Sequence, residues 1–580
     1  MSKVIYVCFK DPLRCNSEME DKIGSIARQI TPDNIVPQPT RISRNKKLIY
    51  GIVNPTNTIA EESNGVFLGT PYGEHDHWWE PGNIIPDGSF SIFRSDEFRT
   101  EVITDVVGSR TIWYYHDSEL FIASSSQRAI IMILGSFNFN SDVIPWMLST
   151  GALGPGFSWD SRIKMLPPNS SISVDYNSWS VSLKTNAIDF KAISISDTNH
   201  EDNLRNSLRK TFSSLNISLG KWVLPLSGGY DSRSILVLFN SIGQNLKKLG
   251  LVTWGLKRAI KEPGNDAYVA KKVADYFKVE HKYYHTDIST EPVSAIFNRY
   301  LVCGEGRIDH VSGYMDGFRI WKTLFEDDVQ GIIRGDEGFG WVGVDSALDV
   351  RLKVGIATCE DFSNLSYFQT SDKSNKIPQF LEIKDGETLE TWRDRLYHEY
   401  RIPVILAALS DLKLSYIEVI NPLLSREIIK QVRIMPDHLR EDKTLFKKVV
   451  NSISPAINYA TSGANANASS ILKSKSVVEM LRSELSTEIC KGILPQEFIA
   501  YILKNLVVAE NRVNWKQKLK SILKLYLPKR IINRLSAFNS RDTIGINVLA
   551  FRSYIICRMT DMLNQDAIRF NASQVTSIND

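Results

Sequence analysis

A glycine-containing loop between an apolar segment and a helical pattern constrains the fold of this chain more than any other feature. Residues 222–226 (WVLPL) are apolar, residues 227–230 (SGGY) form the loop, and a helical pattern follows. A second apolar segment at residues 249–254, a helical pattern over residues 266–277 and an apolar segment near residues 281–284 come next. Strands that alternate with helices of this length predict a parallel sheet with crossover helices. Ligands bind beyond the carboxyl ends of such strands, so the loop is a candidate binding site.

The loop itself has the chemistry of a phosphate-binding site. Its backbone amides, the positive end of the helix dipole and two serine hydroxyls attract anions, and its glycines adopt conformations that other residues resist. A carboxylate would repel phosphates unless a cation lay between them, so Asp231 is a candidate ligand of Mg²⁺. The alternative is a Gly-Gly turn whose helix Asp231 merely caps. The residues predicted to form this binding loop are Leu226, Ser227, Gly228, Gly229, Tyr230, Asp231 and Ser232.

The length of the chain, 580 residues, predicts two large domains, because single hydrophobic cores stop growing at roughly 250 to 300 residues. Short apolar runs broken by Gly, Pro, Asn and Asp predict an α+β first domain, rich in strands, over residues 1–192. The polar residues 193–202 are typical of a linker. We expect the α/β domain over residues 203–510 and a helical, basic extension over residues 511–580.

The loop sequence S-G-G-x-D-S resembles the pyrophosphatase loop of N-type ATP pyrophosphatases. It does not match the G-x-x-x-x-G-K-[ST] loop of kinases and GTPases, because no lysine follows the glycines. Other segments are similar to the asparagine synthetase superfamily and occur in the order expected of that family. In the carboxyl-terminal half these are residues 251–255 (LVTWG), 266–274, 421–436 and 442–447 (DKTLFK). In the amino-terminal half, residues 86–92, 105–108, 120–125 and 166–169 are similar to its glutaminase-type domain.

The resemblance implies a parallel-sheet ATP-pyrophosphatase domain, of the adenine nucleotide α-hydrolase-like kind, behind an α+β Ntn-glutaminase-like domain. It also implies that the loop holds the phosphates that leave as pyrophosphate, and that the strand with Thr253 encloses adenine. Residues 334–340 (RGDEGFG) take the place of the family's acidic motif. Gly335 then belongs to the nucleotide site and Asp336 is the second Mg²⁺ ligand, although a capped turn is the alternative for this acidic pair. The predicted catalytic residues are Asp231, Asp336 and Glu337.

Three departures from the family pattern bear on activity. The family's glutaminase uses a cysteine exposed by removal of the first methionine, whereas this chain has Ser2, and Cys8 and Cys15 lie too far along the chain. Because an alkoxide is far less available than a thiolate near neutral pH, we expect no glutaminase activity. The glutamate that precedes the acidic pair in the family is absent. The family's lysine after a Ser-Pro pair is also missing here, and no substitute is singled out among Lys447, Lys448, Lys473 and Lys475.

These observations predict an asparagine synthetase-like ligase that uses ATP and Mg²⁺ to activate a carboxylate as an acyl-adenylate for attack by ammonia or an amine. One subclass comprises asparagine synthetases and amidotransferases of surface polysaccharides. The other comprises the lasso-peptide cyclases and β-lactam synthetases of natural-product biosynthesis, which have also lost the glutaminase cysteine. A non-catalytic ATP-binding scaffold is the alternative from another class. The sequence does not name the carboxylate or the amine.

Bulk properties limit the partners and the compartment. A net charge of +4 gives no reason to expect nucleic acid as the main partner. No apolar run approaches about 18 residues and no secretory signal is recognisable, so we expect a cytoplasmic protein without stable membrane insertion. Six scattered cysteines indicate neither a zinc site nor a disulfide framework. His75 and His77 lack a third metal ligand and are expected on a surface loop. The basic residues 515–535 are expected to form a helix that packs on its own domain, with membrane or partner binding as the alternative.

Overall fold

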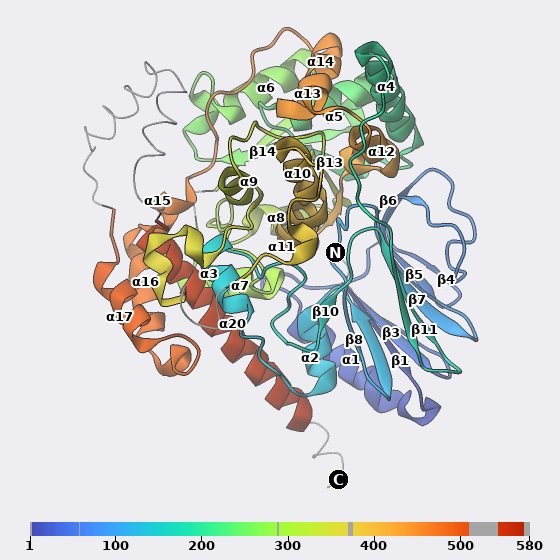
Figure 1. Ribbon diagram of the computed structural model, residues 1–580, viewed down its shortest axis with the longest axis vertical. Helices are drawn as coiled ribbons and strands as arrows, with labels where there is room; N and C mark the ends of the chain where they lie inside the picture. Colours follow the sequence, from blue (N-terminus) through green and yellow to red (C-terminus); the bar gives the residue numbers. More distant parts are fainter. Residues whose placement is uncertain (1–2, 57, 287–288, 369–374, 510–542, 573–580) are drawn as a thin grey trace.

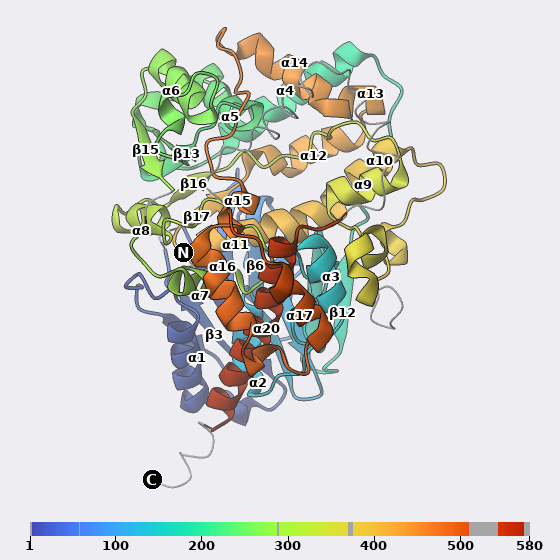
Figure 2. The same ribbon diagram turned by 90° about the vertical axis from the view of Figure 1, so that its left-hand side faces the viewer.

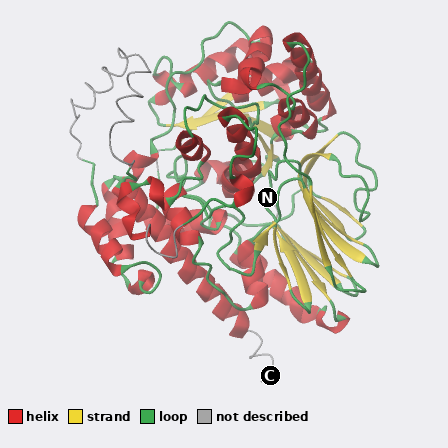
Figure 3. Ribbon diagram, in the orientation of Figure 1, coloured by secondary structure: helices red, strands yellow, loops and turns green. Residues whose placement is uncertain are grey.

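The computed structural model shows a mixed α/β protein with three sheets (Figure 1). It describes residues 3–56, 58–286, 289–368, 375–509 and 543–572. Ser2 and the basic residues 515–535 therefore lie outside the described residues. In Figure 3 the antiparallel strands gather on one side of the molecule, and helices surround the parallel sheet. Within the described residues, no helix combines the length and the apolar character needed to cross a lipid bilayer.

The amino-terminal part consists of two six-stranded antiparallel sheets that pack face to face. The first has the order β10 (Lys164–Met165), β8 (Trp113–His116), β9 (Leu120–Ser124), β1 (Lys3–Phe9), β3 (Leu48–Val53) and β2 (Arg41–Arg44). The second has the order β12 (Val181–Thr185), β11 (Ser170–Asp175), β7 (Arg99–Thr104), β6 (Asp87–Ser95), β5 (Gly65–Tyr72) and β4 (Ala60–Glu62).

Strand β1 lies in the middle of this arrangement and is buried on both faces. Its residues Val4, Tyr6 and Cys8 share a core with the second sheet. The alternate residues Ile5 and Val7 point the other way, toward α1 (Ser17–Gln29) and α2 (Gln127–Leu134), which cover the first sheet. This alternation follows from the two-residue period of a strand. It explains why the β1 sequence is apolar without interruption.

The carboxyl-terminal part is built on a five-stranded parallel sheet, as the sequence predicts. The strand order is β15 (His281–His285), β14 (Gly250–Gly255), β13 (Trp222–Pro225), β16 (Gly331–Ile333) and β17 (Glu418–Ile420). The order of the strands along the chain reverses between β13 and β16, which creates the crevice where open α/β sheets bind ligands. The helix expected over residues 266–277 is α6 (Asp266–Phe277).

Helices cover both faces of the parallel sheet. One face packs against α4 (Asp197–Ser214), α5 (Tyr230–Ser241), α6, α12 (Arg426–Arg433) and α14 (Thr444–Ile453). The other packs against α7 (Val293–Gly304), α8 (Arg319–Glu326) and α11 (Ala407–Leu414). Further helices are α9 (Ala347–Val354), α10 (Leu389–Leu396), a π-helix (Tyr397–Leu406) and α13 (Asp437–Arg440).

Helix α4 corrects the predicted linker. Residues 197–202 are helical, and Ser196 caps α4 by accepting a hydrogen bond from the backbone amide of Asn199. The polar composition of this segment reflects the exposed face of an amphipathic helix, whose other face buries Leu204 and Leu208.

The last described helix connects the two parts of the molecule. Helix α20 (Ile546–Ala572) packs against α2 and α3 (Val143–Thr150) on one side. On the other it meets the helices α15 (Ala468–Leu472), α16 (Lys475–Leu485) and α17 (Gln496–Asn505) (Figure 2). Through α20, one continuous core includes residues from both predicted domains.

Candidate functional site

The predicted phosphate loop joins β13 to α5 and is held together by its own side chains. The backbone amide of Ser227 donates to Ser232 Oγ (2.8 Å), and the amide of Gly229 donates to Ser227 Oγ (3.2 Å). The amide of Gly228 donates to Asp266 Oδ1 (2.8 Å) at the start of α6. The first-turn amides of α5 have no acceptor within the helix, so they and the helix dipole could bind an anion.

Asp231 does not cap α5. The N-cap residue is Gly229, which offers no side chain, and Asp231 lies in the first helical turn. The interpretation of Asp231 as a helix cap is therefore wrong, and its carboxylate is directed to another partner.

The acidic turn after β16 lies directly against this loop. A Cβ atom on Gly335 would approach within 2.9 Å of both the carbonyl carbon of Asp231 and the amide nitrogen of Ser232. Real Cβ atoms essentially never make such contacts, so only glycine allows the two loops to meet here. Strands β13 and β16 are neighbours in the sheet. The predicted residues Asp231, Gly335, Asp336 and Glu337 consequently belong to adjacent loops at one edge.

Lys443 connects the two loops. Its ammonium lies 2.9 and 3.0 Å from the carboxylate oxygens of Asp231 and 2.8 Å from Glu337 Oε1. Asp442 and Lys443 both have positive φ angles, 49° and 58°. Such angles are uncommon for residues other than glycine and cluster at functional sites. The backbone immediately before α14 thus directs this lysine into the site.

Lys443 was not among the residues predicted from the sequence, although it lies in the segment 442–447 (DKTLFK). Of the lysines considered as substitutes, Lys447 pairs with Asp442 (2.7 Å) and its ammonium lies 5.4 Å from the ring centre of Tyr230 in the loop, whereas Lys448 pairs with Glu201 (2.7 Å). The sequence feature that could have indicated Lys443 is the pair Asp442-Lys443 directly before a helix.

The charges of this cluster influence one another. Burial raises the pKa of Glu337 to about 7, Lys443 opposes this rise, and Asp231 adds to it. Burial alone would lower the pKa of Lys443, but Glu337 and Asp231 together raise it above its usual value. The pKa of Tyr397 is raised by burial and by the nearby carboxylates of Glu337, Asp336 and Asp231. The buried phenol thus lies within the electrostatic field of the three predicted catalytic carboxylates.

The carboxylate of Asp336 is paired with a different cation, Arg334. Its Oδ1 lies 2.8 Å from a guanidinium nitrogen of Arg334. The two predicted metal ligands, Asp231 and Asp336, are thus each paired with a positive side chain. No group of three or more His, Cys, Asp or Glu residues suited to a metal ion occurs in the described part of the chain. Two carboxylates fit a Mg²⁺ ion that arrives with phosphate oxygens and water, and they do not form a cage for the ion alone.

Two predicted nucleotide-binding residues have structural roles. The Thr253 hydroxyl donates to the Leu226 carbonyl (2.5 Å) and lies 2.9 Å from His281 Nε2. The backbone amide of Leu226 donates to the carbonyl of Val252 (2.8 Å), and both Leu226 and Thr253 are buried. The Thr253 hydroxyl and the backbone of Leu226 thus tie β13, β14 and β15 together, and the predicted contact of these two residues with a nucleotide stays a prediction.

The cysteine nearest the start of the chain has no nucleophilic character. Cys8 is buried between the two antiparallel sheets, 3.0 Å from Thr100 Oγ1. Burial raises the pKa of its thiol to about 11, so the thiolate is scarce near neutral pH.

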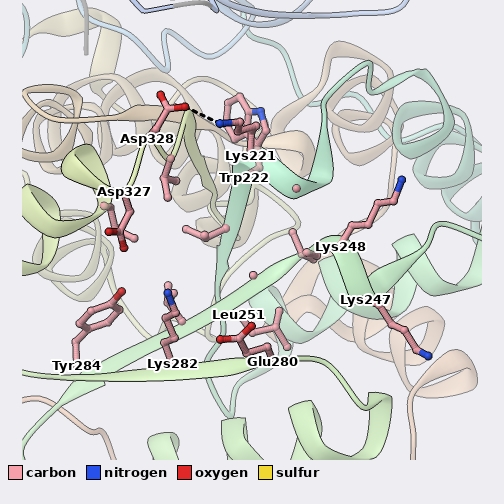
Figure 4. A pocket seen from close by; sticks show the side chains of 17 residues that line it. Lys221, Trp222, Lys247, Lys248, Leu251, Glu280, Lys282, Tyr284, Asp327 and Asp328 are labelled. Carbon is pink, nitrogen blue, oxygen red and sulfur yellow. Dashed lines mark hydrogen bonds and ion pairs between the residues drawn. The ribbon is translucent and has the colours of Figure 1, made fainter.

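A separate pocket of about 490 Å³ lies at the opposite, amino-terminal edge of the parallel sheet (Figure 4). Both lysines and carboxylates line it, and Lys221 is paired with Asp328 (2.5 Å). Lys247, Lys248 and Asp327 also line it and are exposed. This pocket shares no residue with the loop site.

No model of a known protein family matches the sequence, and none of the curated proteins matches it. Among solved structures, the chain is similar to glutamine phosphoribosylpyrophosphate (PRPP) amidotransferase from B. subtilis complexed with ADP and GMP. The identity is 7%, the TM-score is 0.21, and the match covers 51% of this chain and 92% of that chain. A TM-score this low carries no argument about fold or function.

Proposed function

We propose that this chain is an ATP-dependent amide-forming ligase that activates a carboxylate as an acyl-adenylate. The observation that carries the proposal is the position of Lys443, whose ammonium bridges Asp231 of the glycine loop and Glu337 of the acidic turn. The Lys443 ammonium lies beside the start of α5, at the edge of the parallel sheet where the strand order reverses. Both features favour bound phosphates and the charge that develops during phosphoryl chemistry.

The architecture supports a finer assignment of the two parts. The parallel sheet would be an ATP-pyrophosphatase domain of the adenine nucleotide α-hydrolase-like kind, because its glycine loop follows the central strand β13. The stacked antiparallel sheets with α1 and α2 on one outer face would be an Ntn-glutaminase-like domain. Because the thiol of Cys8 is buried, this domain would lack glutaminase activity.

In the proposed first step, ATP binds with its phosphates at the first turn of α5 and the hydroxyls of Ser227 and Ser232. An oxygen of the substrate carboxylate attacks the α-phosphorus, and the bond to the pyrophosphate oxygen breaks as pyrophosphate leaves. When ATP binds, the Lys443 ammonium would exchange its carboxylate partners for phosphate oxygens. It would then neutralise the negative charge that develops on the departing pyrophosphate. A stabilising contact of this kind contributes about 3 to 4 kcal/mol to a barrier.

In the second step, ammonia or an amine attacks the acyl carbon. AMP leaves with the electrons of its bond to the acyl group, and the nitrogen loses one proton. Asp231 and Asp336 would hold a Mg²⁺ ion, which supplies neutralisation of the phosphate charge when bound. Arg334 and Lys443 keep these two carboxylates paired in the absence of a nucleotide.

Exchange of radiolabelled pyrophosphate into ATP tests the proposal, with a panel of amino acids, peptides and sugar acids supplied as carboxylates. We expect exchange that requires both Mg²⁺ and one class of carboxylate. ATP turnover without any pyrophosphate exchange across the panel would count against an adenylate intermediate.

A further inference from the structure

The segment between α14 and α15 crosses the carboxyl edge of the parallel sheet and is bonded to the glycine loop. The backbone amide of Ala460 donates to the Gly228 carbonyl (3.0 Å). Arg233, which is buried in α5, donates to the Ile457 carbonyl (2.7 Å). Residues 457–464, called the strap below, are thereby fixed to the loop by backbone groups.

An aromatic contact adds to this attachment. The ring of Tyr459 stacks on the ring of Tyr230, the loop residue that begins α5, with centroids 3.7 Å apart and an angle of 18° between the planes. The guanidinium carbon of Arg233 lies 4.0 Å from the centre of the Tyr459 ring. Stacked rings and cations over rings both attract. Tyr459 is therefore the main side-chain contact between the strap and the loop.

The strap also occupies the end of the neighbouring strand β14. The amide of Leu256, the first residue after β14, donates to the Ala464 carbonyl (2.9 Å), and the amide of Asp266 donates to the Ser462 carbonyl (2.8 Å). A Cβ atom on Gly255 would lie 2.6 Å from the Ala464 Cβ. The strap backbone thus fills the space beyond β14, beside the loop proposed to hold the phosphates.

Much of the strap is exposed to solvent. Asn458, Thr461, Ser462 and Gly463 are exposed, whereas Ala464 is its buried residue. Opening the strap would break the hydrogen bonds described above and the Tyr459 stacking, but it would expose one buried side chain, that of Ala464. Segments that bury few apolar side chains open more readily than core elements.

We propose that the strap is an internal gate, which occupies the nucleotide-binding edge in the absence of ATP and must leave it before ATP binds. The inference rests on the proposed function, because it concerns access to the same site. A site that is open only part of the time binds its ligand with an affinity reduced by that fraction. Weakening the closed strap should therefore improve ATP binding, and locking it should abolish binding.

The first test replaces Tyr459 by alanine, which removes the stacking on Tyr230. We expect Tyr459→Ala to bind Mg·ATP about three- to tenfold more tightly than the unchanged protein, mainly through faster association. The matched control is Tyr276→Ala, because Tyr276 is a 61% exposed tyrosine of α6 outside the strap. Its binding should equal that of the unchanged protein. Weaker binding by Tyr459→Ala would show that the strap helps to hold the nucleotide, and would overturn the gate.

The second test locks the strap with the double variant Asn265→Cys/Ser462→Cys. These two residues form an isolated parallel bridge, so a disulfide between them would fasten the strap to the start of α6. Asn265 also caps α6, and comparing the same protein oxidised and reduced removes any effect of that lost cap. The unchanged protein, with its half-buried Cys15, is carried through the same oxidation.

We expect the oxidised double variant to bind Mg·ATP about tenfold or more weakly than the reduced double variant, and we expect a reductant to restore the affinity. Equal binding in both redox states would overturn the gate and leave the proposed function standing. Absence of Mg·ATP binding in every form, including Tyr459→Ala, would overturn the proposed function together with the gate.

Discussion

The two edges of the parallel sheet carry the same kinds of charged residues in different arrangements. At the carboxyl edge, Lys443, Asp231 and Glu337 form one connected cluster with separations of 2.8 to 3.0 Å. At the amino edge, Lys247 and Lys248 are exposed beside an open pocket of about 490 Å³. Open volume therefore lies at one edge and concentrated charge at the other.

Strand direction explains this difference. Helix α5 begins at the carboxyl edge, where its first amides and the positive end of its dipole favour anions. It ends toward the amino edge at Ser241, and no basic residue lies in its last turn. Lys443 at the carboxyl edge thus holds two acidic loops together, whereas Lys247 and Lys248 at the amino edge are exposed. Substitutions at matched positions of the two edges test this difference.

The largest contrast is expected between two lysines. Lys443→Gln removes the cation that both loops share, and we expect adenylation to fall by about a thousandfold, which corresponds to roughly 4 kcal/mol. Lys248→Gln at the amino edge should change the rate by less than about twofold. Pyrophosphate exchange rates measure both variants. Similar losses of adenylation rate in the two variants would mean that the carboxyl edge is not the catalytic edge of the sheet.

Asp231→Asn is expected to have the next largest effect. The substitution keeps the size of the side chain and removes its charge, so adenylation should fall by about a hundredfold, or roughly 3 kcal/mol. Because Asp231 is partly exposed and does not cap α5, the melting temperature should change little. Melting curves and exchange rates at saturating Mg²⁺ together test this. Full activity would remove Asp231 from the mechanism.

Two glycines provide a comparison of packing. Gly335→Ala at the carboxyl edge places a Cβ 2.9 Å from backbone atoms of Asp231 and Ser232, so the loops must separate. We expect a loss of about 2 kcal/mol in the free energy of unfolding, together with reduced adenylation. At the amino edge, a Cβ on Gly220 would meet no atom within 4 Å, and Gly220→Ala should fold normally. Denaturant titration of both variants gives the difference, and equal stabilities would contradict the close approach.

The smallest expected effect is a pH dependence of the free energy of unfolding, caused by His398, which contacts the acidic turn after β16. His398 is buried, its Nε2 lies 2.9 Å from the Gly338 carbonyl, and Arg433 Nε lies 3.4 Å from its Nδ1. Burial, with help from Arg433 and Arg440, lowers the pKa of His398 to about 3. As the pH falls below about 6.5, the unfolded chain binds this proton first, so the folded state loses stability.

Between pH 7.5 and pH 5.5 this histidine should account for about 1.4 kcal/mol of lost stability. His398→Gln keeps an amide donor for Gly338 and does not titrate, so its stability should fall less over the same range. Free energies of unfolding at the two pH values measure the difference. Parallel losses in both proteins would mean that His398 is not buried in its neutral form.

Local patterns in the sequence were sufficient to predict the parallel sheet and the position of Asp231 beyond a strand, whereas Gly335, Asp336 and Glu337 were expected at the same site only from the family resemblance. These features depend on strand order and on loops that follow strands directly. The pairing of Lys443 with Asp231 depends on two residues 212 positions apart and on left-handed backbone angles that no periodicity reveals. The hydrogen bond between Thr253 and His281 likewise depends on which strand lies beside β14.

The identity of the products of ATP turnover tests the central claim most directly. The purified protein is incubated with Mg·ATP, a carboxylate that supports exchange, and ammonia or an amine, and phosphorus NMR follows the nucleotides. The carboxyl-edge cluster around Lys443 predicts AMP and pyrophosphate in equal amounts, with both abolished in Lys443→Gln and unchanged in Lys248→Gln. Formation of ADP and phosphate by the unchanged protein would contradict the proposed adenylation.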